Sequence, residues 1–454
     1  MREAKPELAI IGDGYTAAVS VIHLLDQGIA ASRILVIGPD RLGEGKAYGA
    51  RHGDFRLNVR DSLMMIIPKD DRDFPTWAER ELDDPAALTA AGAFYRRGDF
   101  ARYLRQRLDT ALAGQSLPRI RQQATRLQHL GGDGWQISTS DGRTEQARAV
   151  MLATGNPAPR WPVAPDPAIP QERLVAAPWR GDWLGKIEQS GKNATICLVG
   201  GGLTAMDAIL AIRNSGHQGQ INMIIPGGKL PPAQTAWRQA EAIQWPKIGN
   251  AADFLAFMRH HLGRKTLSDS DDDPSWQSRF EALRINISAA WQALPDAEKT
   301  RLMQRLGPLW SRYRFRAAPQ TATAADAMLN SGQLQLHDGF LGKLTWQHNQ
   351  ICITDHKGTS HHADLVVNCT GMGKDKLLHQ LLADGLIQGD ALGLAPAVTS
   401  DGRIIDGSGR PMADFHAIGP LTRGSIGDIV GASSTARMAA QFAIDFAGSD
   451  HSSG

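Results

Sequence analysis

Two glycine-rich turns suited to binding dinucleotides lie far apart in this chain of 454 residues. The first reads Gly-Asp-Gly-Tyr-Thr-Ala over 12–17, and the second reads Gly-Gly-Gly-Leu-Thr-Ala over 200–205. The first glycine of such a turn permits a tight bend, the next lets the backbone approach a pyrophosphate, and a small residue lets the following helix pack closely. Two such turns predict two nucleotide cofactors, an arrangement typical of electron transfer from a nicotinamide to a flavin.

Each turn stands where an apolar run gives way to a helix-like stretch. An apolar run is what a buried parallel strand needs, and the N-terminus of the following helix offers free N–H groups and a positive dipole end to a pyrophosphate. The strand, helix and second strand expected are 8–11, 15–27 and 33–37 in the first unit, and 194–199, 203–213 and 220–225 in the second.

Neither unit has the acidic residue that usually follows the second strand and holds the ribose hydroxyls. In the first unit that place is Gly38, with Asp40 two residues on. In the second it is the stretch 226–229, Pro-Gly-Gly-Lys, which has neither an acid for NADH nor an arginine for NADPH. Lys229 is a candidate phosphate contact, and a solvated lysine is the alternative. The choice between NADH and NADPH stays open.

Two further apolar runs end in Thr-Gly, at Thr154-Gly155 and at Thr370-Gly371, and they bracket the second glycine turn. In flavoproteins with two dinucleotide sites, such strands mark where the chain leaves the flavin domain and where it returns. The fold class predicted is α/β, with two Rossmann-like dinucleotide-binding domains and a helical insertion. The domains expected are 1–180 for FAD, 190–365 for an inserted NAD(P)H-binding domain with a helical segment over 235–331, and 366–454 for the return to the FAD domain.

A C-terminal helix is expected to complete the flavin site. Apolar residues recur at helical spacing from Ser434 to Phe446, and Ser433 or Ser434 is a good N-cap. The positive end of this helix would stabilise the charge of reduced flavin at its N1–C2=O edge. An ordinary capped helix is the alternative interpretation.

Composition excludes several classes of function. The net charge of +2, with 21% charged residues, gives no reason to expect nucleic acid or an anionic membrane as a partner. No run approaches membrane-spanning length and no leader is visible at the N-terminus, so a cytoplasmic protein is expected. The 3 cysteines form no CxxC pair, which argues against a dithiol reductase. The acidic stretch 268–273 lacks the spacing of a calcium loop, and no metal site is expected.

Several longer motifs are spread over nearly the whole chain. They are Leu-Gly-Glu-Gly-Lys-Ala-Tyr-Gly over 42–49, Arg-Leu-Asn-Val over 56–59, Tyr-Arg-Arg over 95–97, Tyr-Arg-Phe-Arg over 313–316, Asn-Cys-Thr-Gly over 368–371 and Ile-Gly-Pro-Leu-Thr-Arg-Gly over 418–424. In these motifs the chain resembles the FAD/NAD(P)-binding family of flavin-dependent monooxygenases, which includes a urate hydroxylase and enzymes that oxidise the amino nitrogen of an amino acid. The chain departs from the family pattern at Tyr313, at Phe315 and over 426–430, which leaves the substrate open.

The resemblance implies an oxidoreductase of the EC 1.14.13 type, with FAD and NADH or NADPH as cofactors. Such an enzyme hydroxylates a small nitrogen-rich metabolite, either a urate-like purine or an amino nitrogen, through a peroxyflavin. The partners expected are the substrate and O₂, and assembly into a homo-oligomer is left open. One alternative is a flavin-dependent NAD(P)H reductase or oxidase that passes electrons to a separate acceptor. Another is a flavin-bound binding protein with little turnover.

The candidate site residues follow from these motifs. Arg97, Arg314, Arg316 and Arg423 could bind an anionic or hydrogen-bond-rich substrate, because a guanidinium fork suits carboxylates and oxopurines, although surface salt bridges are the alternative. Asn58, Arg314 and Arg316 are the candidate catalytic residues. The candidate cofactor-binding residues are Gly12, Gly14, Tyr15, Thr16, Asp40, Gly45, Tyr48, Asn58, Thr154, Gly155, Gly200, Gly202, Leu203, Thr204, Lys229, Thr370, Gly371, Gly419 and Ser433.

Overall fold

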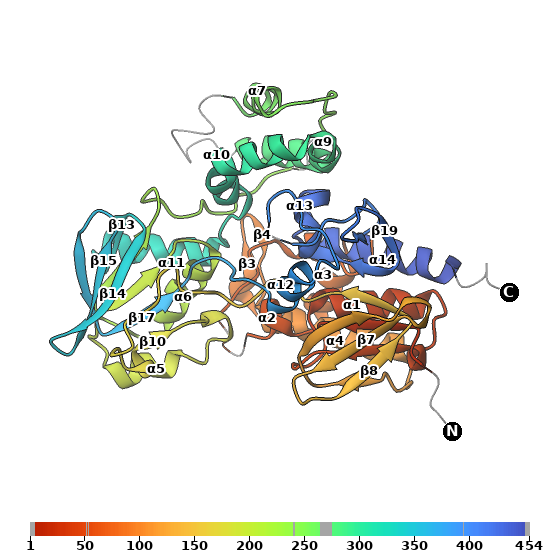
Figure 1. Ribbon diagram of the computed structural model, residues 1–454. Coiled ribbons are helices and arrows are strands. Elements are labelled where there is room, and N and C mark those ends of the chain that lie inside the picture. Colours follow the sequence, from red (N-terminus) through yellow and green to blue (C-terminus); the bar gives the residue numbers. More distant parts are fainter. Residues whose placement is uncertain are drawn as a thin grey trace.

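The computed structural model describes residues 5–50, 52, 54–238, 241–263, 275–393 and 395–449. Two sheets, one entirely parallel and one parallel except for its edge strand, form the centres of two units that lie side by side, and a helical segment lies beyond both (Figure 1). The acidic stretch 268–273 falls outside the described residues.

The first sheet has six strands in the order β18-β19-β9-β1-β2-β5. Its central strands pair in parallel and are apolar and buried, as a sheet covered on both faces requires. Three helices pack together beside it, because their apolar residues share one core cluster with the strands. The strands are β1 (Leu8–Ile11), β2 (Ile34–Ile37), β5 (Arg119–Ile120), β9 (Ala149–Leu152), β18 (Arg403–Ile405) and β19 (Pro411–Ala417), and the helices are α1 (Tyr15–Asp26), α4 (Arg97–Leu112) and α14 (Ala432–Ser449).

The second sheet has five strands, all parallel, in the order β10-β17-β11-β12-β13. Helices α5, α6 and α11 add apolar residues to the core of this unit. The elements are β10 (Leu174–Val175), α5 (Leu184–Ser190), β11 (Ile196–Val199), α6 (Leu203–Asn214), β12 (Ile221–Ile225), α11 (Pro319–Asn330), β13 (Leu334–Asp338) and β17 (Leu365–Asn368).

The strands, helices and turns expected around both glycine turns are therefore confirmed, and so is the α/β fold class. The chain leaves the first sheet after β9, builds the second sheet, and returns to the first sheet with β18 and β19. The outgoing and returning segments run side by side: Pro159 and Met372 form an antiparallel bridge, and Gly373 N donates to Ala158 O at 3.0 Å.

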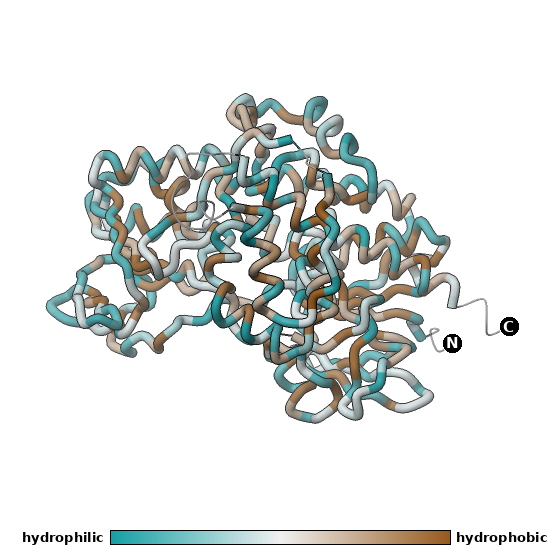
Figure 2. Tube along the Cα trace, turned by 90° about the horizontal axis from the view of Figure 1, so that it is seen from above, coloured by the Kyte–Doolittle hydropathy of each residue, from teal (hydrophilic) through white to brown (hydrophobic). Residues whose placement is uncertain are grey.

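Smaller layers complete each unit. A three-stranded antiparallel sheet of β6 (Ala124–His129), β7 (Trp135–Thr139) and β8 (Thr144–Ala147) covers the first sheet, and one of β14 (Leu341–Gln347), β15 (Gln350–Asp355) and β16 (Ser360–Ala363) covers the second. Short elements include α2 (Gly45–Tyr48), α3 (Asp73–Glu81), β3 (Leu88–Thr89), β4 (Gly92–Ala93), α12 (Lys376–Ala383) and α13 (Arg423–Ile426). Viewed from above, many of the outlying turns are hydrophilic (Figure 2).

The expected helical segment is present between β12 and β13. It contains α7 (Ala251–Leu262), α8 (Ser275–Ile285), α9 (Ile287–Ala293) and α10 (Asp296–Arg314), and it lies at the top of Figure 1. Trp276 and Trp291 are buried in its own core cluster, which explains why this segment is rich in tryptophan. Among the described residues, no helix has the length and apolar character needed to cross a membrane.

Candidate functional site

A cavity of about 1190 Å³ lies between the two units. Its lining comes from the first glycine turn, the segment over 44–48, the strand ends at 153–158 and 370–377, helix α6, the helical segment and the stretch 427–435. Of the candidate residues, those that line it are Gly12, Gly14, Tyr15, Thr16, Asp40, Gly45, Tyr48, Asn58, Arg97, Thr154, Gly155, Leu203, Thr204, Arg314, Thr370, Gly371 and Arg423. Gly12 and Arg423, which are 411 positions apart in the sequence, thus meet at one site.

The first glycine turn has the close approaches that a dinucleotide cradle requires. Gly12 has φ +125°, and a Cβ there would lie 2.3 Å from Ala153 O at the end of β9. Gly45 has φ +47°, and a Cβ there would lie 2.7 Å from the Cα of Gly14. Only glycine is tolerated at these two positive-φ contacts. With α1 beginning at Tyr15, the turn fits a pyrophosphate against a helix N-terminus.

An acidic residue inside the first turn, Asp13, holds the backbone of Asp40 at the position where the ribose is expected. The Asp13 carboxylate accepts a hydrogen bond from the backbone N–H of Asp40, and burial raises the pKa of Asp13. Gly38 is needed beside it, since a Cβ at Gly38 would lie 2.6 Å from Asp13 Cγ. The Asp40 side chain is paired with Arg180. The sequence interpretation missed Asp13, although its place within the Gly-Asp-Gly turn was visible.

The second glycine turn has the same kind of close backbone contact as the first, but its glycines lie away from the cavity. Gly200 has φ +97°, and a Cβ there would lie 2.7 Å from Cys369 O at the end of β17. Nothing lies within 4 Å of a Cβ built on Gly202. Gly200 and Gly202 do not line the cavity. The part of the second unit's glycine turn and helix α6 that does line it consists of Leu203, Thr204 and Asp207. Lys229 lines a separate cavity of about 440 Å³.

The two Thr-Gly strand ends occupy equivalent positions in the two units, each beside its own glycine turn. Thr154 Oγ1 donates to Asp375 Oδ2 at 2.9 Å, and the same carboxylate caps α12. Thr370 Oγ1 donates to Asn368 Oδ1 at 2.6 Å. Both strand ends line the cavity at the point where the chain passes between the units.

The C-terminal helix begins earlier than its sequence suggests, so the expected serine cap is wrong. Helix α14 starts at Ala432, so neither serine is at the N-cap position; Ser434 Oγ lies within the first turn, where it accepts a hydrogen bond from Gly431 N at 3.2 Å and donates one to Gly431 O at 2.9 Å. Ser433 lies within the helix and does not line the cavity, whereas Gly431, Ala432 and Thr435 do. Gly419 also lies off the cavity, and a Cβ there would come 2.9 Å from Thr16 Oγ1.

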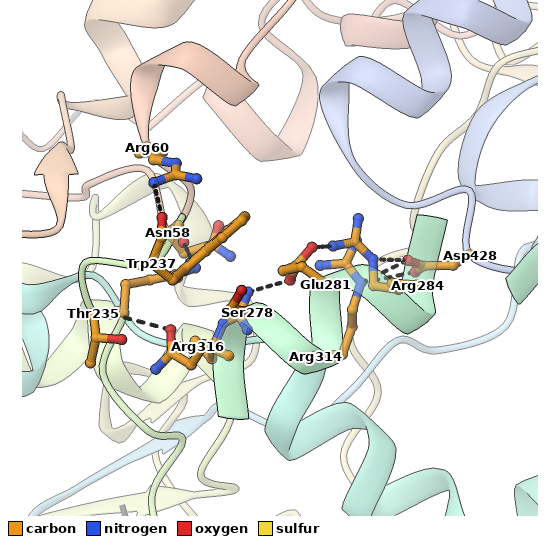
Figure 3. Close-up of polar contacts among 12 residues, drawn as sticks. Asn58, Arg60, Thr235, Trp237, Ser278, Glu281, Arg284, Arg314, Arg316 and Asp428 are labelled. Carbon is orange, nitrogen blue, oxygen red and sulfur yellow. Dashed lines mark hydrogen bonds and ion pairs between the residues drawn. The ribbon is translucent and has the colours of Figure 1, made fainter. Parts of the chain in front are cut away.

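The three candidate catalytic residues are not brought together. Asn58 lines the cavity, and its main-chain oxygen accepts a hydrogen bond from Gln234 Nε2 at 3.0 Å. Arg314 lines it too, but Arg316 does not. The Arg316 guanidinium pairs with Glu281 and lies near the ring of Trp237 (Figure 3). The ring centroids of Trp276 and Phe280 lie 5.6 Å and 5.9 Å from its Cζ. Burial lowers the pKa of Arg316 to about 10.

The cavity arginines differ in whether they are already paired. Arg314 Nε donates to Asp428 Oδ1 at 2.9 Å and Oδ2 at 3.0 Å, and Arg284 binds the same carboxylate from the other side (Figure 3). Although burial opposes the shift, these two guanidinium groups lower the pKa of Asp428. Arg97 pairs with Asp207 at 2.9 Å, across the two units.

Arg423 is the exception among the cavity arginines. It is half-buried in the cavity wall, and burial lowers its pKa. Its guanidinium donates to Met372 Sδ at 3.6 Å and forms no ion pair with a carboxylate of the described residues. The charge of Asp390 acts on Arg423 without forming an ion pair, so an anion entering the cavity can bind this guanidinium without displacing an ion-pair partner.

The described residues provide neither a reactive cysteine nor a cluster of metal-ligating side chains. All three cysteines are free and buried, as expected, and burial raises the pKa of Cys197 to about 12. Within the described parts of the chain, no group of three His, Cys, Asp or Glu side chains could hold a metal ion.

Comparison with known proteins agrees with this geometry. Residues 9–157 match the model of a protein family described as FAD-NAD(P)-binding. The chain carries a FAD/NAD(P)-binding domain. No curated protein matches the chain.

Solved structures extend the likeness to the whole chain. The reduced ornithine hydroxylase from Pseudomonas aeruginosa has a TM-score of 0.64 at 15% identity, covering 98% of this chain and 99% of that one. The ornithine N-hydroxylase from Kutzneria sp. 744, solved with reduced FAD, NADP⁺ and L-ornithine, has a TM-score of 0.63 at 14% identity, covering 98% and 100%. A bacillithiol disulfide reductase from Bacillus cereus has a TM-score of 0.55 at 15% identity, covering 98% and 99%. The fold is thus that of flavoproteins with two dinucleotide-binding domains.

Proposed function

We propose that this protein is an FAD-dependent, NAD(P)H-using monooxygenase that hydroxylates the amino nitrogen of a small metabolite carrying a carboxylate. The reaction consumes NAD(P)H, a proton, O₂ and the amine, and it yields NAD(P)⁺, water and the hydroxylamine. The observation that carries the proposal is that one cavity touches the first glycine turn, helix α6 of the second unit and Arg423, which has no ion-pair partner among the described residues.

The chain's own residues would bind and orient the cofactors. Gly12, Gly14 and Gly45 leave room for the pyrophosphate of FAD, and Asp40 lies where the ribose is expected. The nicotinamide would enter over the N-terminal turn of α6. Bound FAD would supply the redox chemistry of such a reaction, hydride acceptance and oxygen transfer, while these residues hold and orient it. In this assignment residues 1–180 and 366–454 hold FAD, and 190–365 hold the coenzyme.

The helical segment would exclude water from the reacting centre. It contributes a largely apolar wall made of Phe254, Met258, Ile287, Trp291, Leu302, Met303, Leu306 and Trp310. Expelling water strengthens the electrostatic interactions within a site and suppresses side reactions. A flavin site that must transfer oxygen without releasing peroxide needs such a wall.

The substrate class follows from the arginines. A carboxylate forms its strongest contact with a guanidinium that it can approach in a forked geometry. Arg97, Arg314 and Arg316 already have acidic partners, so Arg423 is the anchor we assign to the substrate. The ornithine hydroxylases that share the fold act on an amine, which supports an amino nitrogen over a purine.

A substrate screen with the FAD-loaded protein tests the proposal. Oxygen uptake and NAD(P)H oxidation are measured with amino acids, with the matching amines that lack a carboxylate, and with urate. We expect oxidation and a hydroxylamine product only with a carboxylate-bearing amine. Arg423→Met should raise KM for that substrate by about ten- to a hundredfold, the loss of one charge-assisted contact.

The matched control is Arg410→Met, because Arg410 is an exposed arginine that pairs with Asp406 on the β18–β19 hairpin. It should leave KM unchanged. Equal NADH consumption with every compound, with all O₂ appearing as peroxide, would identify an oxidase instead. Stimulation by urate alone would assign the purine.

A further inference from the structure

The second unit has an acid near the expected ribose position, but it comes from the neighbouring strand. In a βαβ unit the adenosine ribose lies beside the end of the second strand, where an acidic residue normally holds its hydroxyls. Here that strand is β12, and the residues after Ile225 include no acid. Strand β13 pairs in parallel with β12, and the register partner of Ile225 is Asp338.

Asp338 is directed at the loop that follows β12. Its Oδ1 accepts a hydrogen bond from Gly227 N at 2.7 Å, and a Cβ built on Gly228 would lie 3.5 Å from the Asp338 Cβ. Gly227 and Gly228 both have positive φ, +79° and +61°, so the loop conformation depends on both glycines. The carboxylate is thereby held at the carboxyl end of β12, although it is attached to β13.

The glycine turn, β12 and Asp338 form one continuous edge. A Cβ on Gly201 would come 2.0 Å from Ile225 Cδ1, which places the turn directly against the end of β12. On the other side of Ile225, Gly339 N donates to Ile225 O at 3.3 Å. A dinucleotide whose pyrophosphate lies at the second turn would therefore extend its adenosine half along this edge.

The carboxylate remains available to a ligand. The Asp338 side chain is 57% exposed, and its Oδ2 pairs with Lys357 Nζ at 3.0 Å. Two carboxylate oxygens offer about four lone-pair positions, and these contacts leave some of them free. Lys229 follows the same loop but lines the smaller cavity, so it is directed elsewhere.

We infer that Asp338 selects the coenzyme: its carboxylate accepts a hydrogen bond from the 2′-hydroxyl of the adenosine ribose and repels a 2′-phosphate, so the protein uses NADH in preference to NADPH. This inference rests on the proposed use of a nicotinamide coenzyme. The cation of Lys357 weakens the repulsion without cancelling it, because a 2′-phosphate would carry more negative charge than one lysine neutralises.

Calorimetric titration of the FAD-loaded protein with NAD⁺ and NADP⁺ tests the inference by binding alone. NAD⁺ should bind at least about tenfold more tightly than NADP⁺. Asp338→Asn keeps an oxygen for Gly227 N but removes the charge, and it should reduce that ratio by about tenfold, mainly through tighter NADP⁺ binding. Lys357→Gln should have the opposite effect and widen the ratio.

The matched control is Asp141→Asn. Asp141 also accepts backbone and cation contacts, from Arg143, but it lies in the β7–β8 turn of the first unit. It should leave the ratio unchanged. The inference is overturned if NADP⁺ binds as tightly as NAD⁺ or more tightly, or if a folded Asp338→Asn protein keeps the wild-type ratio. If neither nucleotide binds, the proposed function fails together with it.

Discussion

The two glycine turns share a sequence pattern, yet the protein surrounds them differently. The first lines the cavity and is crowded by its own chain, with Gly45 against Gly14 and Asp13 against Gly38. The glycines of the second lie off the cavity, and the first two of them are also crowded by the chain. Nothing, however, lies within 4 Å of a Cβ on Gly202, whereas a Cβ on Gly14, at the same place in the first turn, would lie 3.7 Å from the Cα of Gly45. A cradle closed by neighbouring segments suits a group that stays bound, and an open one suits a cosubstrate that must leave after each turnover. The difference supports FAD at the first turn and the nicotinamide coenzyme at the second.

The most severe test compares an alanine at the crowded first glycine of the first turn with an alanine at the open third glycine of the second turn. Gly12→Ala places a Cβ 2.3 Å from Ala153 O at φ +125°, so it should destabilise the fold by more than about 2 kcal/mol and give a protein that purifies without flavin. Gly202→Ala meets no atom within 4 Å and should keep the flavin and the thermal midpoint while weakening coenzyme binding. Absorbance at 450 nm per protein and calorimetric titration measure both. A yellow, stable Gly12→Ala protein would contradict the closed cradle.

A smaller effect is expected where the two units touch. Burial raises the pKa of Asp207 from 3.8 to about 6, although Arg97 opposes the shift. A folded state that holds this proton more tightly than the unfolded state gains stability at low pH and loses that gain as pH rises from about 4 through 6. One pKa unit corresponds to about 1.4 kcal/mol, so the loss should be about 1–3 kcal/mol.

Asp207→Asn should flatten this part of the pH profile of unfolding free energy. The measurement is denaturant unfolding at several pH values between 4 and 7. Asp141→Asn, at an exposed ion pair within one unit, serves again as the control: the hydrogen bond from Thr139 lowers the pKa of Asp141, so its removal acts at the acid end of the range and should leave the slope between about pH 5 and 7 unchanged. An unaltered slope in Asp207→Asn would show that the contact between the units does not carry this proton.

The smallest effect concerns the cysteines. All three are buried, and burial raises the pKa of both Cys197 and Cys369, which lie behind the second glycine turn. Because the thiolate is the reactive form, we expect no reaction of the native protein with a thiol reagent within minutes and full reaction after denaturation. Cys352→Ser should leave NAD(P)H oxidation unchanged. Rapid labelling of the native protein would contradict this expectation and would favour a disulfide reductase function for the second unit.

Sequence patterns predicted the parts of this molecule that depend on neighbours along the chain. The apolar runs, the glycines and the Thr-Gly strand ends predicted both turns and part of the cavity lining, since a strand, a tight turn and a helix start are set by a few consecutive residues. Helix α14 shows the limit of this reasoning. Ser434 has the right side chain for a cap, but the helix had already begun at Ala432.

Residues whose role depends on distant partners could not be ranked from sequence. Arg314, Arg316 and Arg423 look equivalent in the chain, and only the fold reveals that Asp428 and Glu281 pair with the first two. Asp338 was overlooked for the same reason: it lies 111 residues after Gly227, whose N–H it binds, and reaches it only because β13 pairs with β12. Pairing between strands and burial of charge are tertiary properties.

The pairing of Ala158–Pro159 with Met372–Gly373 means that the second unit begins and ends at the same point of the first unit. Because the entry and exit of the second unit are joined by a hydrogen bond, everything between them forms a cassette with adjoining ends. Segments with adjoining ends are the ones that can be removed, exchanged or grafted with little disturbance to the host domain. A short linker from 158 to 373 would bridge the gap, and the remaining chain would still contain every strand of the first sheet.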